Sequence, residues 1–425
     1  MRHDIIKRVI LDMRQVIQDT DITDREYRFE EKANYILVGV RRSGKSTLLY
    51  KMARDLVKMG ADCDQICYVN FEDDRLMEFT NKDFDDIIES AHEFTNKKNY
   101  YFFDEIQNID GWERFARRLA DHKERVYITG SNARMLSSEM EARLGGRYIS
   151  KMIMPFSLAE ALDYRHIPHD SEALLTTSLA GQIRGASDEY FYAGGLPESL
   201  DFKNKRDYIQ NVYDKVLLGD IISRNKLKNP EAMRLLMKKI AETVMHEVSF
   251  NKLAGAVKST GVRFSTDAAI IYTGYAEESY LIFHLSNYVA KFSEKESTPK
   301  FYFTDNGFLS LFLVDKDSSL LENAVADRLR RLYGDQVCYY KSRTKGIDID
   351  FYLPEENLAV QVTYSLDADS YDREIGSLVK LSRSSEGNSR TRYLIVTHED
   401  EKKIETDEIT IEVVPLYRFL LLQDL

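Results

Sequence analysis

The chain has 425 residues, of which 43% are hydrophobic and 30% are charged, and its formal net charge is −11. This length exceeds one ordinary core and predicts about three domains. The composition is typical of a soluble globular protein. The negative charge argues against a surface that attracts nucleic acid over its whole area, although it leaves room for a local basic face.

The sequence also argues against export and membrane insertion. No apolar run approaches the roughly 20 residues that cross a bilayer. The segment from Met1 to Arg8 mixes charged and apolar residues, so we expect no signal peptide. The three cysteines, Cys63, Cys67 and Cys338, fit a reducing compartment. Cys63 and Cys67 have the spacing of two zinc ligands, but the sequence has no second Cys/His pair that would complete a zinc site. We therefore expect a cytoplasmic protein without a membrane anchor.

The first predicted element is an amphipathic helix within residues 1–20. From about Asp4 to Gln18, apolar residues recur at the spacing of one helix face. We expect this helix to pack on the outside of the domain that follows, which we place at residues 21–154.

A phosphate-loop pattern, G-x-x-x-x-G-K-S/T, then occurs at Gly39, Val40, Arg41, Arg42, Ser43, Gly44, Lys45, Ser46 and Thr47. An apolar strand-like run precedes it and a helical run follows, which is the context that this motif needs. The two glycines permit backbone angles that direct successive N–H groups and a helix N-terminus at a phosphate. We expect Lys45 to reach the β- and γ-phosphates of ATP and the Ser46 hydroxyl to ligate Mg²⁺.

A second chemical signal follows a predicted strand (65–71) and a predicted helix (83–94). Residues 99–106 form a short apolar run that ends in two adjacent carboxylates, as expected of a strand buried on both faces of a parallel sheet. We assign Asp104 to the magnesium ion and Glu105 to activation of the attacking water.

After a predicted helix (111–122), the strand at 125–132 ends in small polar residues. Thr129, Ser131 and Asn132 are candidates to contact the γ-phosphate or the water, and the sequence does not choose among them. For Ser131 and Asn132 a simple helix cap is the alternative.

These motifs, in this order, resemble the prokaryotic AAA-like ATPases, and in particular the group that also carries a nuclease-like C-terminal domain of unknown function. The matching segments are 39–46, 68–73, 102–107, 129–133, 144–148, 154–160 and 192–198, so the resemblance extends over essentially the whole chain. It implies an α/β P-loop fold, a possible homo-oligomer, and an arginine at the γ-phosphate from the same or a neighbouring subunit. Arg147 is the best candidate, with Arg143 and Arg134 as alternatives.

Residues 155–295 are predicted to be mainly helical, with two helices within 207–246. The Gly-Gly-Leu-Pro segment at 194–197 predicts a tight turn and not a second phosphate loop, because no Lys-Ser follows. Helices at 249–257 and 265–272 and a strand at 280–285 have the order of a winged helix-turn-helix. The second helix offers DNA no Arg or Lys, only Thr266, Asp267, Thr273 and Tyr275, with Lys258 and Arg263 nearby. DNA contact and a structural or protein-contact role both stay open, and the second is favoured.

The last third, residues 296–425, alternates strands and helices and resembles PD-(D/E)XK nuclease domains. The resemblance places Asp350, Gln361 and Thr363 at the metal-binding motif, with Thr363 where a lysine belongs. Glu322, Asp350 and Gln361 could still form a weak second metal site, but without the lysine we expect no cleavage. Lys341, Arg343 and Lys345 could contact phosphate, but a solvated charged loop is the favoured explanation.

The sequence therefore favours an AAA-like ATPase that hydrolyses Mg-ATP to drive or switch its attached domains. An adaptor that binds ATP with negligible turnover and recruits DNA or protein is the alternative. An ATP-regulated DNA nuclease is a third reading, which Thr363 argues against.

Overall fold

The computed structural model describes residues 2–132, 135, 138–314, 317–387 and 390–422. It divides into two compact units, Met1–Met154 with Glu278–Tyr280, and Pro155–Glu277 with Leu281–Leu425. Apart from residues 278–280, the segments 155–295 and 296–425, expected as separate parts, thus belong to one unit. None of the helices in the described ranges is long and apolar enough to cross a membrane.

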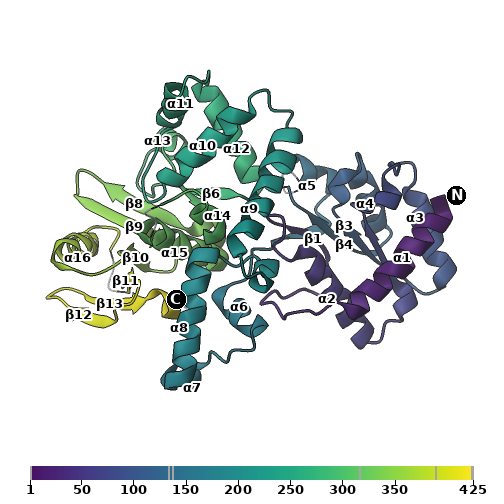
Figure 1. Cartoon of the computed structure of the whole chain (residues 1–425), viewed down its shortest axis with the longest axis horizontal. Coiled ribbons are helices and arrows are strands. Elements are labelled where there is room, and N and C mark those ends of the chain that lie inside the picture. The colour runs from purple at the N-terminus through teal and green to yellow at the C-terminus, as the bar shows by residue number, and fades with distance from the viewer. Residues whose placement is uncertain (1, 133–134, 136–137, 315–316, 388–389, 423–425) are drawn as a thin grey trace. The chain divides into compact units, whose positions relative to one another are not determined.

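The first unit is built on a parallel five-stranded sheet with the order β2-β3-β4-β1-β5 (Figure 1). Its strands are β1 (Asn34–Val38), β2 (Ile66–Asn70), β3 (Tyr100–Asp104), β4 (Arg125–Gly130) and β5 (Tyr148–Met152). Four of these strands were predicted from the sequence, and β5 was not. The three inner strands are almost wholly buried, which is why they read as continuous apolar runs.

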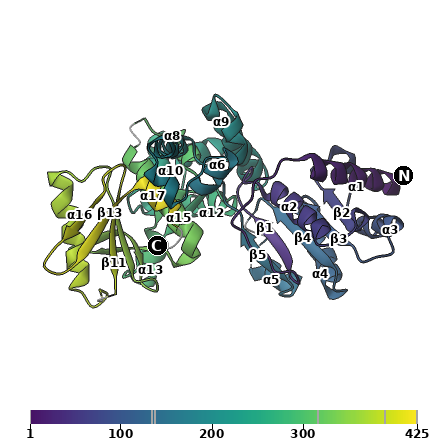
Figure 2. The same ribbon diagram turned by 90° about the horizontal axis from the view of Figure 1, so that it is seen from below.

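Five α-helices belong to this unit: α1 (Arg2–Asp19), α2 (Lys45–Lys58), α3 (Phe84–Phe94), α4 (Trp112–Asp121) and α5 (Ser138–Leu144). Short 3₁₀ turns are η1 (Cys63–Gln65), η2 (Asp74–Leu76) and η3 (Ile106–Asn108). The amino-terminal helix α1 lies on the outside of the unit, as predicted (Figure 2). The guanidinium group of Arg14 ties it to the sheet by donating to the carbonyl of Ile66 at 3.0 Å.

The core of this unit is aromatic. The rings of Tyr68, Phe102 and Tyr127, on three neighbouring strands, stack in a row with centroid separations of 6.0 and 4.8 Å. Leu37 and Leu49 pack into the same cluster and join strand β1 to helix α2. This packing fixes the strand that precedes the phosphate loop and the helix that follows it.

The second unit begins with helices. They are α6 (Leu158–Tyr164), α7 (Ser171–Leu175), α8 (Thr177–Ala193), η5 (Pro197–Asp201), α9 (Lys205–Lys215), the π-helix η6 (Val216–Ser223), α10 (Pro230–Glu242), α11 (Phe250–Ser259) and α12 (Thr266–Glu278). The predicted turn after α8 is present: Gly194 has a φ of 72°, and the N–H of Gly195 donates to the Asp305 carboxylate at 2.7 Å. A side chain on Gly194 would collide with that carboxylate, which explains why glycine stands there.

Two sheets complete the second unit. An antiparallel pair joins β6 (Ile282–Leu285) to β7 (Lys300–Phe303). A six-stranded mixed sheet has the order β12-β13-β11-β10-β9-β8. Its strands are β8 (Cys338–Ser342), β9 (Ile347–Leu353), β10 (Leu358–Val362), β11 (Arg392–Thr397), β12 (Lys402–Glu405) and β13 (Thr410–Pro415). Strands β12 and β13 were not predicted.

The remaining elements are α13 (Phe292–Ser297), α14 (Asn306–Ser310), α15 (Asp317–Tyr333), η7 (Gly334–Gln336), α16 (Ala368–Ser382) and α17 (Leu416–Leu421). Figure 2 shows α16 on one side of the six-stranded sheet and α15 and α17 on the other. Ile349, Leu378 and Ile395 belong to the apolar core between this sheet and α16. Sheet and helices together hold the residues of the predicted second metal site.

Candidate functional site

The phosphate loop connects β1 to α2 in a strained, glycine-dependent conformation. Gly39 has a φ of 147° and Gly44 a φ of 92°, and a Cβ on Gly39 would lie 2.1 Å from the carbonyl oxygen of Ile153. Helix α2 starts at Lys45, and no side chain caps it at Gly44. Its first N–H groups are therefore left for another acceptor, as an anion-binding loop requires.

Lys45 lies inside this loop and not on the surface. Its side chain is only 4% exposed, and its ammonium group donates to the carbonyl oxygens of Gly39 and Val40 at 3.0 Å each. The hydroxyl of Ser43 is buried beside it, and no hydrogen-bond partner for it is found in the described part of the chain. The loop thus holds a buried cation and an unsatisfied polar atom, which suits a polyanionic ligand.

Asp104 ends strand β3 and is fixed by hydroxyl groups from both neighbouring strands. Tyr68 of β2 donates to one carboxylate oxygen at 2.8 Å, and Thr129 of β4 donates to the other. The hydroxyl of Thr129 also accepts the backbone N–H of Glu105 at 2.9 Å. Thr129 therefore fixes both acidic residues from the strand that lies between β3 and β1.

Glu105 follows in a left-handed backbone conformation, with a φ of 52°. Its carboxylate accepts hydrogen bonds from Ser131, at 3.3 Å, and from Gln107. Burial raises the pKa of Glu105 above its ordinary value, although the positive charge of Lys45 counteracts this effect. A partly desolvated carboxylate of this kind is suited to accept a proton from water.

Two of the three polar residues at the end of β4, Thr129 and Ser131, donate hydrogen bonds to the acidic pair. Asn132 is also buried at this strand end. Tyr68 and Gln107 lie in the segments 68–73 and 102–107 that carry the family resemblance, but neither was predicted as a site residue, because their contacts with the acidic pair depend on the fold.

Arg147 does not lie beside the phosphate loop of its own chain. In the β1–β5 register, Tyr148 pairs with Asn34 and Met152 with Val38, so Arg147 lies at the edge opposite to the loop that follows Val38. Its guanidinium group forms an ion pair with Asp121 at the end of α4. Of the two placements expected for this arginine, in the same or in a neighbouring subunit, the register therefore does not support the first for Arg147.

The structure describes only one of the two alternative arginines. Arg143 forms an ion pair with Glu113 of α4 at 2.7 Å. Arg134 lies outside the described residues. Within the loop itself, Arg41 pairs with Glu72 at 2.8 Å, and Arg42 is exposed.

The residues at this sheet edge fit ATP and Mg²⁺. The uncapped helix start, the buried ammonium group of Lys45 and the orphaned hydroxyl of Ser43 suit a triphosphate, and the hydroxyl of Ser46 and the carboxylate of Asp104 are oxygen donors of the kind that Mg²⁺ prefers. A family model described as "AAA domain" matches residues 31–162. Residues 31–162 form an AAA-like P-loop domain. The AAA-like domain thus includes the phosphate loop and the acidic pair.

A second model, described as a domain of unknown function (DUF8612), matches residues 184–319. Among curated proteins, the chain is similar to the uncharacterized protein MJ1544 of Methanocaldococcus jannaschii, with 29% identity across 98% of this chain and 95% of that protein. An uncharacterized protein of Haemophilus influenzae is 28% identical across 80% of this chain and 84% of its own length.

Solved structures show weaker similarity. The Walker-type ATPase PABY2304 of Pyrococcus abyssi aligns with a TM-score of 0.43 and 12% identity, covering 70% of this chain and all of that one. The Orc1 protein of Aeropyrum pernix, solved in complex with DNA, aligns with a TM-score of 0.30 and 15% identity, covering 76% and 94%.

The residues of the predicted second site belong to the second unit. Glu322 of α15 and Asp350 of β9 approach each other there, but the ammonium group of Lys300 lies between them. The side-chain amide of Gln361 on β10 accepts the backbone N–H of Asp350 and donates to the carboxylate of Glu374. Among the described residues, no group of three or more His, Cys, Asp or Glu side chains is arranged to hold a metal ion.

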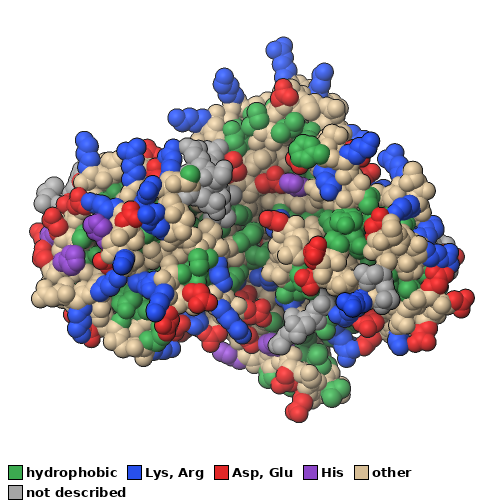
Figure 3. Space-filling model, turned by 180° about the vertical axis from the view of Figure 1, so that it is seen from behind, with side chains coloured by type: hydrophobic (Ala, Val, Ile, Leu, Met, Phe, Trp, Pro, Cys, Tyr) green, Lys and Arg blue, Asp and Glu red, His purple; other side chains and the backbone are tan. Residues whose placement is uncertain are grey.

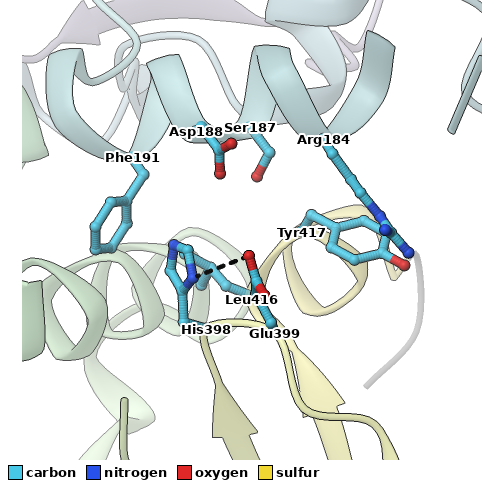
Figure 4. A pocket seen from close by; sticks show the side chains of 8 residues that line it. All are labelled: Arg184, Ser187, Asp188, Phe191, His398, Glu399, Leu416 and Tyr417. Atoms are coloured by element: carbon cyan, nitrogen blue, oxygen red, sulfur yellow. Dashed lines mark ion pairs between the residues drawn. The ribbon is translucent and has the colours of Figure 1, made fainter. Parts of the chain in front are cut away.

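One pocket of this unit contains no residue predicted from the sequence. It has a volume of about 180 Å³ and lies between one face of α8, the start of α17 and the turn after β11 (Figure 4). His398 forms part of its wall, stacked on the ring of Tyr364 at 4.8 Å, with the ring of Phe191 edge-on. Acidic and basic groups both line it, so its charge favours no ligand class.

Proposed function

We propose that this protein hydrolyses ATP at the edge of the parallel sheet and uses the cycle to switch its C-terminal unit. The observation that carries the proposal is the arrangement around Thr129, which fixes the carboxylate of Asp104 and the backbone of Glu105 at once. A protein that only stored ATP would need the phosphate loop but no fixed acidic pair beside it.

Each residue has a separate task in this proposal. Lys45 neutralises charge on the phosphates, in exchange for its present bonds to the loop carbonyls. When bound, Mg²⁺ would supply further neutralisation of the phosphate oxygens, held by Ser46 and Asp104. Glu105 orients a water molecule and accepts its proton, and Ser131 and Gln107 hold the Glu105 carboxylate in place.

The test is phosphate release by wild type and Glu105→Gln. The amide keeps the shape of the side chain but cannot accept the proton, so we expect turnover to fall at least about 100-fold while binding of labelled ATP persists. Glu89→Gln, an exposed change on helix α3, is the matched control and should leave turnover unchanged. Equal, near-zero release by wild type and Glu105→Gln would instead favour an ATP-binding adaptor without turnover.

The position of Arg147 supports a homo-oligomer. Because Arg147 lies at the opposite sheet edge from its own phosphate loop, only a neighbouring subunit could bring this arginine to the γ-phosphate. The exchange would cost its ion pair with Asp121, which is partly exposed and therefore weak. We propose that Arg147 completes the site of the adjacent subunit.

The winged-helix arrangement favours a protein partner over DNA. Helices α11 and α12 precede the β6–β7 pair in the expected order. Helix α12 carries no Arg or Lys, and it exposes Ile270 and Ile271, which are 48% and 51% accessible. Figure 3 shows basic and acidic side chains interspersed over one face of the molecule. A DNA-reading helix would bring phosphate-binding cations, so we propose that α12 contacts protein.

We propose that the carboxyl-terminal part has a nuclease-like fold. The order α15, β8, β9, β10, α16, β11 supports this reading, with Glu322 on the first helix and Asp350 on the second strand. Conversion of supercoiled plasmid, with wild type and Asp350→Ala compared, tests whether it cleaves DNA. We expect no cleavage by either protein. We place the whole protein in the cytoplasm.

A further inference from the structure

A buried lysine occupies the centre that the nuclease-like fold would offer to a metal ion. Lys300, on β7, is only 3% exposed. Its ammonium nitrogen lies 3.6 Å from Oε1 of Glu322 and 3.4 Å from Oδ1 of Asp350. One cation thus bridges two carboxylates that come from a helix and from a different sheet.

The surroundings of the ammonium group are built for a permanent charge. The hydroxyl of Tyr302 donates to Oε1 of Glu322 at 2.7 Å, which fixes the carboxylate that faces Lys300. The ring of Tyr339 lies 5.3 Å from the ammonium nitrogen and adds a cation–π contact. Burial alone would lower the pKa of Lys300. The negative charges of Glu322 and Asp350 raise this pKa by more than burial lowers it, so the net shift is upward and the side chain stays charged.

Gln361 is not free to serve as a third ligand. The β9–β10 pairing ends at Phe351 and Val360, and side chains satisfy the backbone beyond that point. The side-chain oxygen Oε1 of Gln361 accepts the backbone N–H of Asp350 at 2.8 Å. Its amide nitrogen donates to Asp348 O and to Glu374, at 2.9 and 2.7 Å. Both ends of the amide are therefore occupied.

Asp350 has a structural partner as well. Its Oδ2 accepts the N–H of Val362 at 3.0 Å, while its Oδ1 faces Lys300. Thr363, which replaces the expected lysine, donates its hydroxyl to the carbonyl of Ser365 at 3.0 Å. The side chains of Asp350, Gln361 and Thr363 thus all make hydrogen bonds within the protein.

We propose that Lys300 is the resident counterion of Glu322 and Asp350, and that its ammonium group stands in this centre where a divalent cation would otherwise bind. A metal ion needs oxygen ligands at about 2.0–2.6 Å and could not share the space between these carboxylates with an ammonium group. The centre is therefore metal-free and does not cleave phosphodiesters. This inference rests on contacts within the C-terminal unit and is independent of ATP hydrolysis.

The first test measures Mn²⁺ binding by electron paramagnetic resonance, with full-length, nucleotide-free wild type and Asp350→Asn. The two proteins should bind equal amounts of Mn²⁺ up to about 1 mM, because Asp350 is not a ligand. One equivalent of Mn²⁺ bound by wild type and lost in Asp350→Asn would overturn the proposal. So would plasmid cleavage that Asp350→Asn abolishes.

The second test asks whether Lys300 serves as the counterion. Lys300→Met leaves the buried carboxylate of Glu322 and the partly buried carboxylate of Asp350 without their cation, so we expect the thermal midpoint of the protein to fall by about 5–10 °C. Adding Glu322→Gln removes one stranded charge and should restore about half of that loss. Lys341→Met, which removes a partly exposed partner of Asp348, is the control and should shift the midpoint by less than about 2 °C.

If Lys300→Met does not fold, the double variant and the Mn²⁺ measurement still decide. A stable Lys300→Met protein, or a Lys300→Met/Glu322→Gln protein no more stable than Lys300→Met, would show that the ammonium group does not balance these carboxylates.

Discussion

The hydroxyl of Tyr68 donates a hydrogen bond of 2.8 Å to the carboxylate of Asp104, and both side chains are fully buried. Strands β2 and β3 run side by side, so this bond crosses from one to the other just below the sheet edge. Burial raises the pKa of Tyr68 well above its usual value, so the hydroxyl stays a donor at every working pH. The proposed magnesium ligand is thus oriented before any nucleotide arrives.

Tyr68→Phe should slow ATP hydrolysis. Without the hydroxyl, one oxygen of Asp104 loses its donor, and we expect turnover to fall about 10-fold, equivalent to about 1.4 kcal/mol. Steady-state phosphate release across a magnesium titration measures the effect. Tyr100→Phe, at the far end of β3, is the control. Turnover equal to that of wild type would mean that Thr129 alone orients the carboxylate.

Gly39→Ala should abolish nucleotide binding and destabilise the amino-terminal unit. The new methyl group would lie 2.1 Å from the Ile153 oxygen, in addition to the strain of a positive φ. Gly60→Ala separates the two effects, because Gly60 also has a positive φ, 107°, but open space around it. We expect a loss of about 1 kcal/mol at Gly60 and clearly more at Gly39, measured by thermal unfolding. Equal losses would exclude the steric explanation.

Mixing two inactive proteins should restore ATP hydrolysis. Glu105→Gln lacks the water-activating group, and Arg147→Ala lacks the arginine that we assign to the neighbouring site. In a mixed oligomer, an Arg147→Ala subunit supplies an intact acidic pair and its Glu105→Gln neighbour supplies the arginine. At equal amounts, about a quarter of the sites should recover if subunits mix at random. Phosphate release that merely averages the two parents would argue against this arrangement.

Asp305 should make stability depend on pH. Burial raises the pKa of Asp305 to about 7 in the folded protein, despite the N–H bonds from Gly195 and Gly307 that counteract it. Since the folded protein holds this proton more tightly than the unfolded chain, the stabilisation is complete below about pH 4 and is lost as pH rises toward 7.

Thermal midpoints of wild type and Asp305→Asn between about pH 4 and pH 7 test the direction of this pH dependence. Asparagine does not titrate, so wild type should lose stability relative to the variant as pH rises. The loss should approach about 1.4 kcal/mol per pH unit at most. A parallel pH dependence in both proteins would show that Asp305 keeps its ordinary pKa.

Much of the fold follows from local sequence patterns. The buried strands of the parallel sheet are continuous apolar runs, and the helix after the phosphate loop begins at Lys45, within the motif that predicts it. Strand β5 escaped prediction because it lies at the sheet edge, half exposed, with Ser150 and Lys151 among its residues. The π-helical turn at Val216–Ser223 has no sequence signal that separates it from an ordinary helix.

The site was less predictable because its contacts depend on strand order and register. The sequence indicates which strand ends carry polar residues, but it does not tell that β4 lies between β1 and β3 and presents Thr129 to both acids. The position of Lys300 could not be predicted for the same reason. The family pattern places a lysine two residues after Gln361, whereas the ammonium group that faces Asp350 comes from Lys300, 50 residues earlier in the chain.

Strand β5 is short, yet it connects two places that matter for the proposed cycle. Just beyond its carboxyl end, the N–H of Ile153 donates to Val38, and the carbonyl of Ile153 lies against Gly39; its amino end follows directly on Arg147. Five residues of extended chain cannot shorten, so a displacement of one end is transmitted to the other. If an adjoining subunit displaced Arg147, strand β5 would therefore transmit the displacement to the phosphate loop.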